Sequence, residues 1–251
     1  MEQTELLIES TLDGTMQPSL FFKSEGEEKR PLLVSLHTWS FNRYSIVKTM
    51  LPLAEKLGFN LLLPEFRGPN LAKNPNCTKA CGSEFAMRDI KDTIDYLIRN
   101  ENIDSENIFL LGQSGGGHMA LMIAGYCPEY FKAIAAYVPI TDLSKWAVEN
   151  EKYRPRVIAC CTESREEMLK RSPVTYIDNI AKANLKIFHG KTDPVVPVSQ
   201  SIDFYNDLIK AYPKARVFLD IFDGGHEIDL NTAEYWIRSQ YKGAEKIDVL
   251  G

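Results

Sequence analysis

Short, continuously apolar runs alternate along the chain with longer segments in which apolar residues recur every three or four positions. The short runs lie at residues 32–36, 60–64, 108–112, 133–139, 185–190 and 217–222. Uninterrupted apolar runs of this length are typical of strands that are covered on both faces. Two earlier runs, TELLIES and SLFFKS, predict a pair of antiparallel strands near the start. The pattern therefore predicts a mostly parallel central sheet.

The longer segments have the period of amphipathic helices. In residues 83–100, charges occupy one side, Ser83 can cap the start, and the other side is apolar through Met87, Ile90, Ile94, Leu97 and Ile98. Residues 44–57 form a second such segment, which is expected to end at Gly58. Strands that alternate with helices in this way predict an α/β fold with helices on both faces of the sheet.

Length and composition indicate one domain with one insertion. The chain has 251 residues, of which 44% are hydrophobic, so residues 1–251 are expected to share a single core. The regular alternation is interrupted at residues 141–172, a polar stretch of mixed charge between two predicted strands. Insertions at the carboxyl end of a strand commonly form lids or binding-site walls. A short lid or cap is therefore expected at 141–172.

The charge balance excludes some partners. A formal net charge of −5 argues against a nucleic-acid surface, which needs clustered Lys and Arg. The opening MEQTELLIESTLDG lacks a basic region followed by an apolar one, and no stretch approaches the roughly 18 apolar residues of a membrane span. These features predict a cytoplasmic protein that acts on a small molecule, with no membrane or nucleic-acid partner.

The five cysteines are odd in number and occur without an export signal, so mostly reduced thiols are expected. Cys77 and Cys81 lie four residues apart without a histidine or a second cysteine pair at zinc-like spacing, so no metal site is predicted. The adjacent Cys160 and Cys161 are interpreted as small buried side chains.

Candidate chemistry begins at GQSGG, residues 112–116, which has the pattern Gly-x-Ser-x-Gly. A strand is predicted before it and a helix after it, which is the context of a nucleophile elbow. The tight turn would expose Ser114 at the edge of the sheet, where the helix N-terminus favours developing negative charge. The alternative interpretation is a glycine-rich turn in which Ser114 merely caps the helix.

A nucleophilic serine needs a base, and the base needs a partner that fixes its tautomer. The chain has four histidines, at positions 37, 118, 189 and 226. His226 follows the last predicted strand, and Asp193 follows the strand before it. The order Ser114, Asp193, His226 is the chain order of an α/β-hydrolase triad. Asp223 is an alternative acid, less favoured because it is so close to His226 in sequence, and the other histidines are interpreted as structural.

Several segments together resemble the catalytic domain of the prolyl-oligopeptidase family, over about residues 30–240: LGQSGGGHMAL, IFHGKTDPVVP, DGGHE, LPEFRGPN and SPVTYIDNI. The resemblance implies an α/β-hydrolase fold, with Ser114 as the nucleophile, His226 as the base and Asp193 as the acid that orients it. Peptidases of that family usually carry an aromatic residue directly after the serine. This chain has Gly115 there, as many esterases have a small residue.

The oxyanion of an acyl-transfer reaction needs hydrogen-bond donors. The backbone N–H of Gly115 is expected to supply one donor, and that of Thr38 or Trp39, in the loop after the strand at 32–36, the other. Trp39 is also a candidate wall of the acyl pocket. Trp146 and Tyr153, inside the insertion, are candidate substrate contacts. For each of these aromatic residues, core packing is the alternative role.

Taken together, the residues predict a serine hydrolase that cleaves small carboxylic esters through an acyl-enzyme and needs neither cofactor nor metal. The runner-up is an amino- or oligopeptidase of the prolyl-oligopeptidase type that uses the same triad. A third hypothesis, from another class, is a non-catalytic binding module on a hydrolase fold. The presence of all three triad residue types, in order, argues against that third hypothesis.

Overall fold

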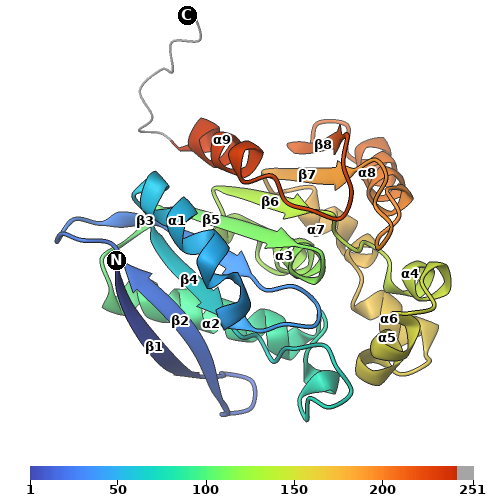
Figure 1. The fold of residues 1–251 in the computed structure, drawn as a ribbon, viewed down its shortest axis with the longest axis horizontal. Helices are drawn as coiled ribbons and strands as arrows, with labels where there is room; N and C mark the ends of the chain where they lie inside the picture. The colour runs from blue at the N-terminus through green and yellow to red at the C-terminus, as the bar shows by residue number, and fades with distance from the viewer. Residues whose placement is uncertain (242–251) are drawn as a thin grey trace, which may run out of the picture.

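An eight-stranded sheet runs through the computed structural model, which describes residues 1–241 (Figure 1). Its strand order is β1-β2-β4-β3-β5-β6-β7-β8. The strands are β1 (Glu2–Glu9), β2 (Met16–Lys23), β3 (Arg30–Leu36), β4 (Asn60–Pro64), β5 (Ile103–Gln113), β6 (Ala133–Tyr137), β7 (Leu185–Gly190) and β8 (Val217–Phe222). Strand β2 is antiparallel to both β1 and β4, and all the later pairings are parallel. The predicted α/β-hydrolase architecture is confirmed.

Helices cover both faces of this sheet. One face packs against α2 (Glu84–Asn100), α3 (Gly115–Tyr126), α7 (Ile177–Ile180) and α8 (Ser199–Ala211). The other packs against α1 (Val47–Leu57) and α9 (Leu230–Gln240). Strands β3, β4 and β6 and the second half of β5 are almost wholly buried, which is why their sequences are continuous apolar runs rather than alternating ones.

Two helix ends lie at the residues that the sequence predicted for them. The hydroxyl of Ser83 accepts a hydrogen bond from the backbone N–H of Ala86 at 3.2 Å and caps α2. Gly58 ends α1 with a φ of 72°, a conformation that favours glycine. The start of α1 differs from the expectation, because Arg43–Ile46 form a separate 3₁₀ turn, η1, before the α-helix begins.

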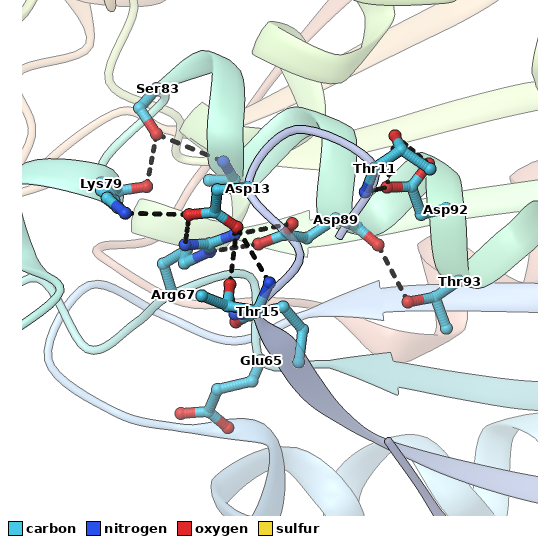
Figure 2. A network of polar contacts seen from close by, with 12 residues as sticks. Thr11, Asp13, Thr15, Glu65, Arg67, Lys79, Ser83, Asp89, Asp92 and Thr93 are labelled. Carbon is cyan, nitrogen blue, oxygen red and sulfur yellow. Dashed lines mark hydrogen bonds and ion pairs between the residues drawn. The ribbon is translucent and has the colours of Figure 1, made fainter. Parts of the chain in front are cut away.

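A buried arginine fastens the turn between β1 and β2 to helix α2 and to the loop after β4 (Figure 2). Arg67 donates through Nη1 and Nη2 to the carboxylate of Asp13 at 2.9 and 3.0 Å. It also donates through Nε and Nη2 to Asp89 on α2, at 2.5 and 3.1 Å. Hydrogen bonds from Arg67, then Lys79 and Thr15, hold the pKa of Asp13 well below its ordinary value. The first hairpin is therefore tied to the body of the domain by charge as well as by strand pairing.

Residues 141–172 depart from the regular alternation, as expected, and form three short helices between β6 and β7. These are α4 (Leu143–Glu149), α5 (Arg154–Cys161) and α6 (Arg165–Lys170). Figure 1 shows them on the side toward which the parallel strands point. The remaining 3₁₀ turns are η2 (Cys77–Lys79), η3 (Pro128–Tyr130) and η4 (Pro173–Tyr176).

The cysteines correct one expectation. Cys77 on η2 and Cys160 on α5 form a disulfide, so the expectation of reduced thiols is wrong for this pair. The pairing escapes sequence analysis because its members are 83 residues apart and meet only when α5 packs on η2. Cys81 and Cys161 are buried free thiols whose sulfur atoms lie 3.7 Å apart beside the disulfide-bonded segments.

No helix within residues 1–241 combines the length and the apolar character that crossing a bilayer would require.

Candidate active site

Ser114 alone makes the turn between β5, which ends at Gln113, and α3, which begins at Gly115. Its φ of 57° and ψ of −120° lie in a region that residues with a side chain rarely adopt. The turn also needs a close approach to β3, because a Cβ at Gly116 would lie 2.2 Å from the carbonyl oxygen of Leu36. The sharp turn holds the hydroxyl at the carboxyl edge of the sheet.

The loops after β7 and β8 bring an acid and an imidazole to this serine. His226 Nε2 lies 2.8 Å from the Oγ atom of Ser114, and its Nδ1 lies 2.7 Å from Asp193 Oδ2. The side chain of Asp193 is fully buried, whereas that of His226 is 19% exposed. With the carboxylate ionised, Nδ1 carries the proton donated to Asp193, and Nε2 accepts from the serine hydroxyl. The imidazole is therefore held in the tautomer that a general base needs.

The carboxylate of Asp193 is held at both oxygen atoms. Its Oδ1 accepts the backbone N–H groups of Val195 and Val196 at 2.8 and 2.9 Å. Its Oδ2 also lies 3.4 Å from the Nε2 atom of the buried His189. Burial acts to raise the pKa of Asp193, but the hydrogen bonds from His189, His226 and the two backbone groups outweigh it, so the pKa falls well below its ordinary value. Asp193 is accordingly an anion at neutral pH.

Gly115 and Trp39 lie backbone to backbone beside the serine. A Cβ at position 115 would fall 2.5 Å from the backbone nitrogen of Trp39. Of the two residues considered for the second oxyanion donor, Trp39 is thus the one whose N–H adjoins Gly115. The carbonyl oxygen of Thr38 is within 3.0 Å of His37 Nδ1 and accepts the N–H of Phe41, so Thr38 shapes the loop.

The three candidate substrate-contacting aromatic residues form one continuous stack. The rings of Trp39 and Trp146 meet edge to face with centroids 5.1 Å apart, and Tyr153 lies 4.9 Å from Trp146. Trp146 also donates through Nε1 to the carbonyl oxygen of Val195, at 2.9 Å, in the loop that holds Asp193. Trp39 and Trp146 are 3% and 1% exposed, and Tyr153 is half-buried. The stack links helices α4 and α5 to the loop after β3.

His37 and His118 contact backbone carbonyls in other loops. His118 Nε2 donates to the carbonyl oxygen of Arg171 at 2.7 Å, and burial lowers the pKa of His118 to about 4. His37 Nε2 lies 2.9 Å from the carbonyl oxygen of Glu65. These contacts make each of the two a link between loops.

Two polar contacts near the site were not anticipated from the sequence. His189 lies four residues before Asp193, so their spacing alone could have suggested the contact. Arg156 on α5 donates to the hydroxyl of Ser40, in the loop that carries Trp39, at 2.8 Å. Nothing in the sequence indicates that contact, because the two residues are 116 positions apart.

Comparison with known proteins decides the family. The model of the prolyl oligopeptidase family matches residues 52–246, a span that includes Ser114, Asp193 and His226. The chain belongs to the prolyl oligopeptidase family. Membership confirms the resemblance noted in the sequence and places the chain among the serine hydrolases.

The similar proteins include both peptidases and an esterase. A rice acylamino-acid-releasing enzyme is 25% identical over 254 residues, covering 89% of this chain and 31% of the relative. The acylaminoacyl peptidase of Pyrococcus horikoshii has a TM-score of 0.73 at 22% identity, over 95% of this chain and 40% of that one. An esterase of Pyrococcus furiosus has a TM-score of 0.70 at 18% identity, and the match covers 95% of this chain and 89% of the esterase. The chain spans about a third of the length of the curated relatives it matches.

Proposed function

We propose that this protein hydrolyses small carboxylic esters through an acyl-enzyme formed on Ser114. The observation that carries the proposal is the hydrogen-bonded series Ser114, His226 and Asp193, assembled from three separate loops at one edge of the sheet. Each of the three has the partner that its role requires: the hydroxyl has a base, the base has a buried anion, and the anion has fixed donors.

In the proposed reaction, Ser114 Oγ attacks the ester carbonyl while His226 Nε2 takes the hydroxyl proton. The backbone N–H groups of Gly115 and Trp39 donate to the oxyanion that develops. Asp193 stabilises the imidazolium without taking its proton. His226 then protonates the departing alcohol, and a water molecule activated by the same imidazole releases the acid and restores Ser114. The reaction needs only side chains and backbone groups of this chain, with water as the second substrate.

Trp39, Trp146 and Tyr153 are proposed to form the wall of the acyl pocket, with residues 141–172 acting as its cap. The support is their position: Trp39 adjoins Gly115 through its backbone, and Trp146 bonds to the loop of Asp193. A wall joined to both the oxyanion loop and the acid loop is well placed to sense the shape of the acyl group.

The second candidate is a peptidase that removes an acylated amino acid. It is favoured by the family match and by the names of the curated relatives. Esters are favoured by Gly115, which differs from the aromatic residue usual in peptidases of this family.

Labelling by a fluorophosphonate probe tests the nucleophile. We expect a single modified peptide that carries Ser114, because a base-activated serine beside oxyanion donors phosphonylates readily. Ser114→Ala should abolish labelling, while Ser239→Ala, an exposed serine on α9, should leave it intact. Labelling that survives Ser114→Ala would refute the assignment. No labelling of folded wild type would favour a non-catalytic binding module.

Matched substrates separate the two candidate functions. Unactivated alkyl acetate esters should be cleaved with a higher kcat/KM than N-acetyl-amino-acid amides with about the same number of heavy atoms. Both classes would use the same triad, so the ratio reports leaving-group and subsite recognition alone. A peptide cleaved more efficiently than every unactivated ester would move the conclusion to the peptidase.

A further inference from the structure

Tyr153, at the end of the aromatic stack, lies near two cations. The guanidinium carbon of Arg156 is 4.9 Å from the centre of the tyrosine ring, and the ammonium nitrogen of Lys152 is 6.0 Å from it. Within residues 1–241, no carboxylate oxygen comes within 4.0 Å of the charged nitrogens of either side chain. Lys152 and Arg156, which we call the cationic rim, are therefore without an ion-pair partner in the described part of the chain.

Arg156 has hydrogen-bonding capacity to spare. A guanidinium has five N–H donors, and the hydrogen bond described for Arg156 uses one of them, from Nη1 to the neutral hydroxyl of Ser40. By contrast, Arg67 and Arg43 each bond to two different carboxylates. Arg156 is thus oriented by a neutral group while its charge stays available, which suits recognition of an anion from outside the chain.

The position of Arg156 relates this charge to the candidate active site. Ser40 directly follows Trp39, so the two Cα atoms are about 3.8 Å apart. The backbone nitrogen of Trp39 in turn adjoins Gly115, the residue after Ser114. The contact with Ser40 consequently holds the guanidinium one residue along the loop from the proposed oxyanion donor. Tyr153 connects the same guanidinium to the proposed acyl wall through Trp146.

We propose that Arg156, assisted by Lys152, binds a carboxylate on the acyl chain of the substrate, so that the preferred substrates are monoesters of dicarboxylic acids. This inference rests on the proposed ester hydrolysis at Ser114. A planar guanidinium binds a carboxylate through paired, charge-assisted hydrogen bonds. Tyr153, the half-buried member of the stack, is the ring that would contact the methylene groups between the carboxylate and the scissile carbonyl. The carboxylate takes no part in bond breaking and acts only on binding and orientation.

The test compares monomethyl adipate with methyl hexanoate, which has the same number of acyl carbons but no second carboxylate. Wild type should have the higher kcat/KM for the anionic ester, and added salt should reduce the difference because the cationic rim is partly exposed. Arg156→Gln should lower the ratio of the two kcat/KM values by about ten- to a hundredfold, the typical effect of losing a charge-assisted hydrogen bond. Arg156→Lys should retain part of the preference, since it keeps the charge but not the paired geometry.

Arg154→Gln is the matched control. Arg154 is exposed on the same helix and lines a separate hollow between α4, α5 and α6, so its loss should leave the ratio unchanged. Lys152→Gln gives a second variant should Arg156→Gln fold poorly, and it should lower the ratio more weakly. A wild type with no preference for the anionic ester, or a ratio that survives Arg156→Gln, would overturn the inference.

Failure of this inference is distinguishable from failure of the proposed function. If Ser114 is labelled and methyl hexanoate is hydrolysed without any preference for the adipate ester, only the carboxylate site is refuted. If wild type hydrolyses neither ester and Ser114 is not labelled, the ester hydrolase proposal fails and the carboxylate site fails with it. Competition by glutarate, which should slow labelling of Ser114 in wild type but not in Arg156→Gln, gives a readout that does not depend on turnover.

Discussion

Gly115 and Trp39 are packed so closely that a side chain at position 115 has no space: its Cβ would lie 2.5 Å from the backbone nitrogen of Trp39 and 2.6 Å from the Trp39 Cα. Real Cβ atoms do not approach backbone atoms to this distance, so any larger residue must displace the loop. The glycine and the path of the loop after β3 therefore depend on each other. An aromatic residue at position 115 would not fit beside the loop in its present path.

The first prediction follows from that contact. Gly115→Ala should lower kcat for an unactivated ester by about a hundred- to a thousandfold, because shifting Trp39 removes a donor from the oxyanion. Steady-state kinetics on purified, folded protein measure it. Gly225→Ala is the control, since a Cβ there would meet nothing nearer than 3.9 Å. Wild-type kcat in Gly115→Ala would mean that the Trp39 N–H takes no part in the reaction.

The second prediction concerns the acid. Asp193→Asn should reduce kcat by about a thousand- to ten-thousandfold, because the neutral amide neither holds the tautomer of His226 nor stabilises its charged form. Asp223→Asn should have little effect, since the carboxylate that bonds to His226 Nδ1 is Asp193. The pair of variants is compared on one ester at saturating concentration. Equal losses in both variants would argue against a specific role for Asp193.

The third prediction is a loss of stability in mild acid. His118 has a folded-state pKa of about 4 against an ordinary value of 6.5, because burial disfavours its charged form. Between these two values only the unfolded chain takes up the proton, so the free energy of unfolding should decline as pH falls from 6.5 toward 4, by on the order of 3 kcal/mol in total. Above pH 6.5 the histidine is neutral in both states and contributes no slope.

Urea unfolding at pH 7 and pH 5 measures this effect. His118→Gln should flatten the pH dependence, even if it changes stability at pH 7, because Gln does not titrate. Part of the slope will remain, since burial also lowers the pKa of His37 and gives it the same direction of dependence. Asp193 contributes in a lower range, because its depressed pKa matters only once the unfolded carboxylate begins to be protonated. A variant as acid-sensitive as wild type would contradict the assignment to His118.

The fourth prediction concerns the bond between η2 and α5. Cys77→Ser, or a reductant, should lower the free energy of unfolding by about 2–4 kcal/mol, because the disulfide closes a loop of 83 residues and restricts the unfolded chain. Cys127→Ala is the control: it removes a free thiol and keeps the disulfide, so it should lose stability on reduction by as much as wild type does. Thiol titration of unfolded, unreduced protein should count three free thiols. Five free thiols, with no effect of reductant, would refute the bond.

Local patterns carried most of what the sequence could predict. The strands could be predicted from their runs of apolar residues. The start of α2 and the end of α1 could be predicted from single residues, Ser83 and Gly58. Ser114, Asp193 and His226 could be selected because parallel strands end at one edge, so residues that directly follow them converge. Their separation in sequence is irrelevant to that argument.

The features that escaped prediction depend on tertiary packing between distant segments. The hydrogen bond of Arg156 with Ser40 and the disulfide of Cys77 with Cys160 both require α5 to pack against the loop after β3 and against η2. The sequence of residues 141–172 marks an insertion but does not encode where its helices dock. The choice between Thr38 and Trp39 likewise needed the backbone path beside Gly115, which no residue pattern specifies.

The helices at 141–172 are fastened at several separate points. The disulfide joins α5 to η2, Trp146 bonds to Val195, and the side-chain oxygen of Gln200 accepts the backbone N–H groups that lead into α4. Anchors in different directions leave these helices no common axis about which to rotate. These helices are therefore expected to keep one position relative to η2, the loop after β7 and helix α8. If they cap the active site as proposed, they form a fixed wall rather than a moving gate, and turnover should show little dependence on solvent viscosity.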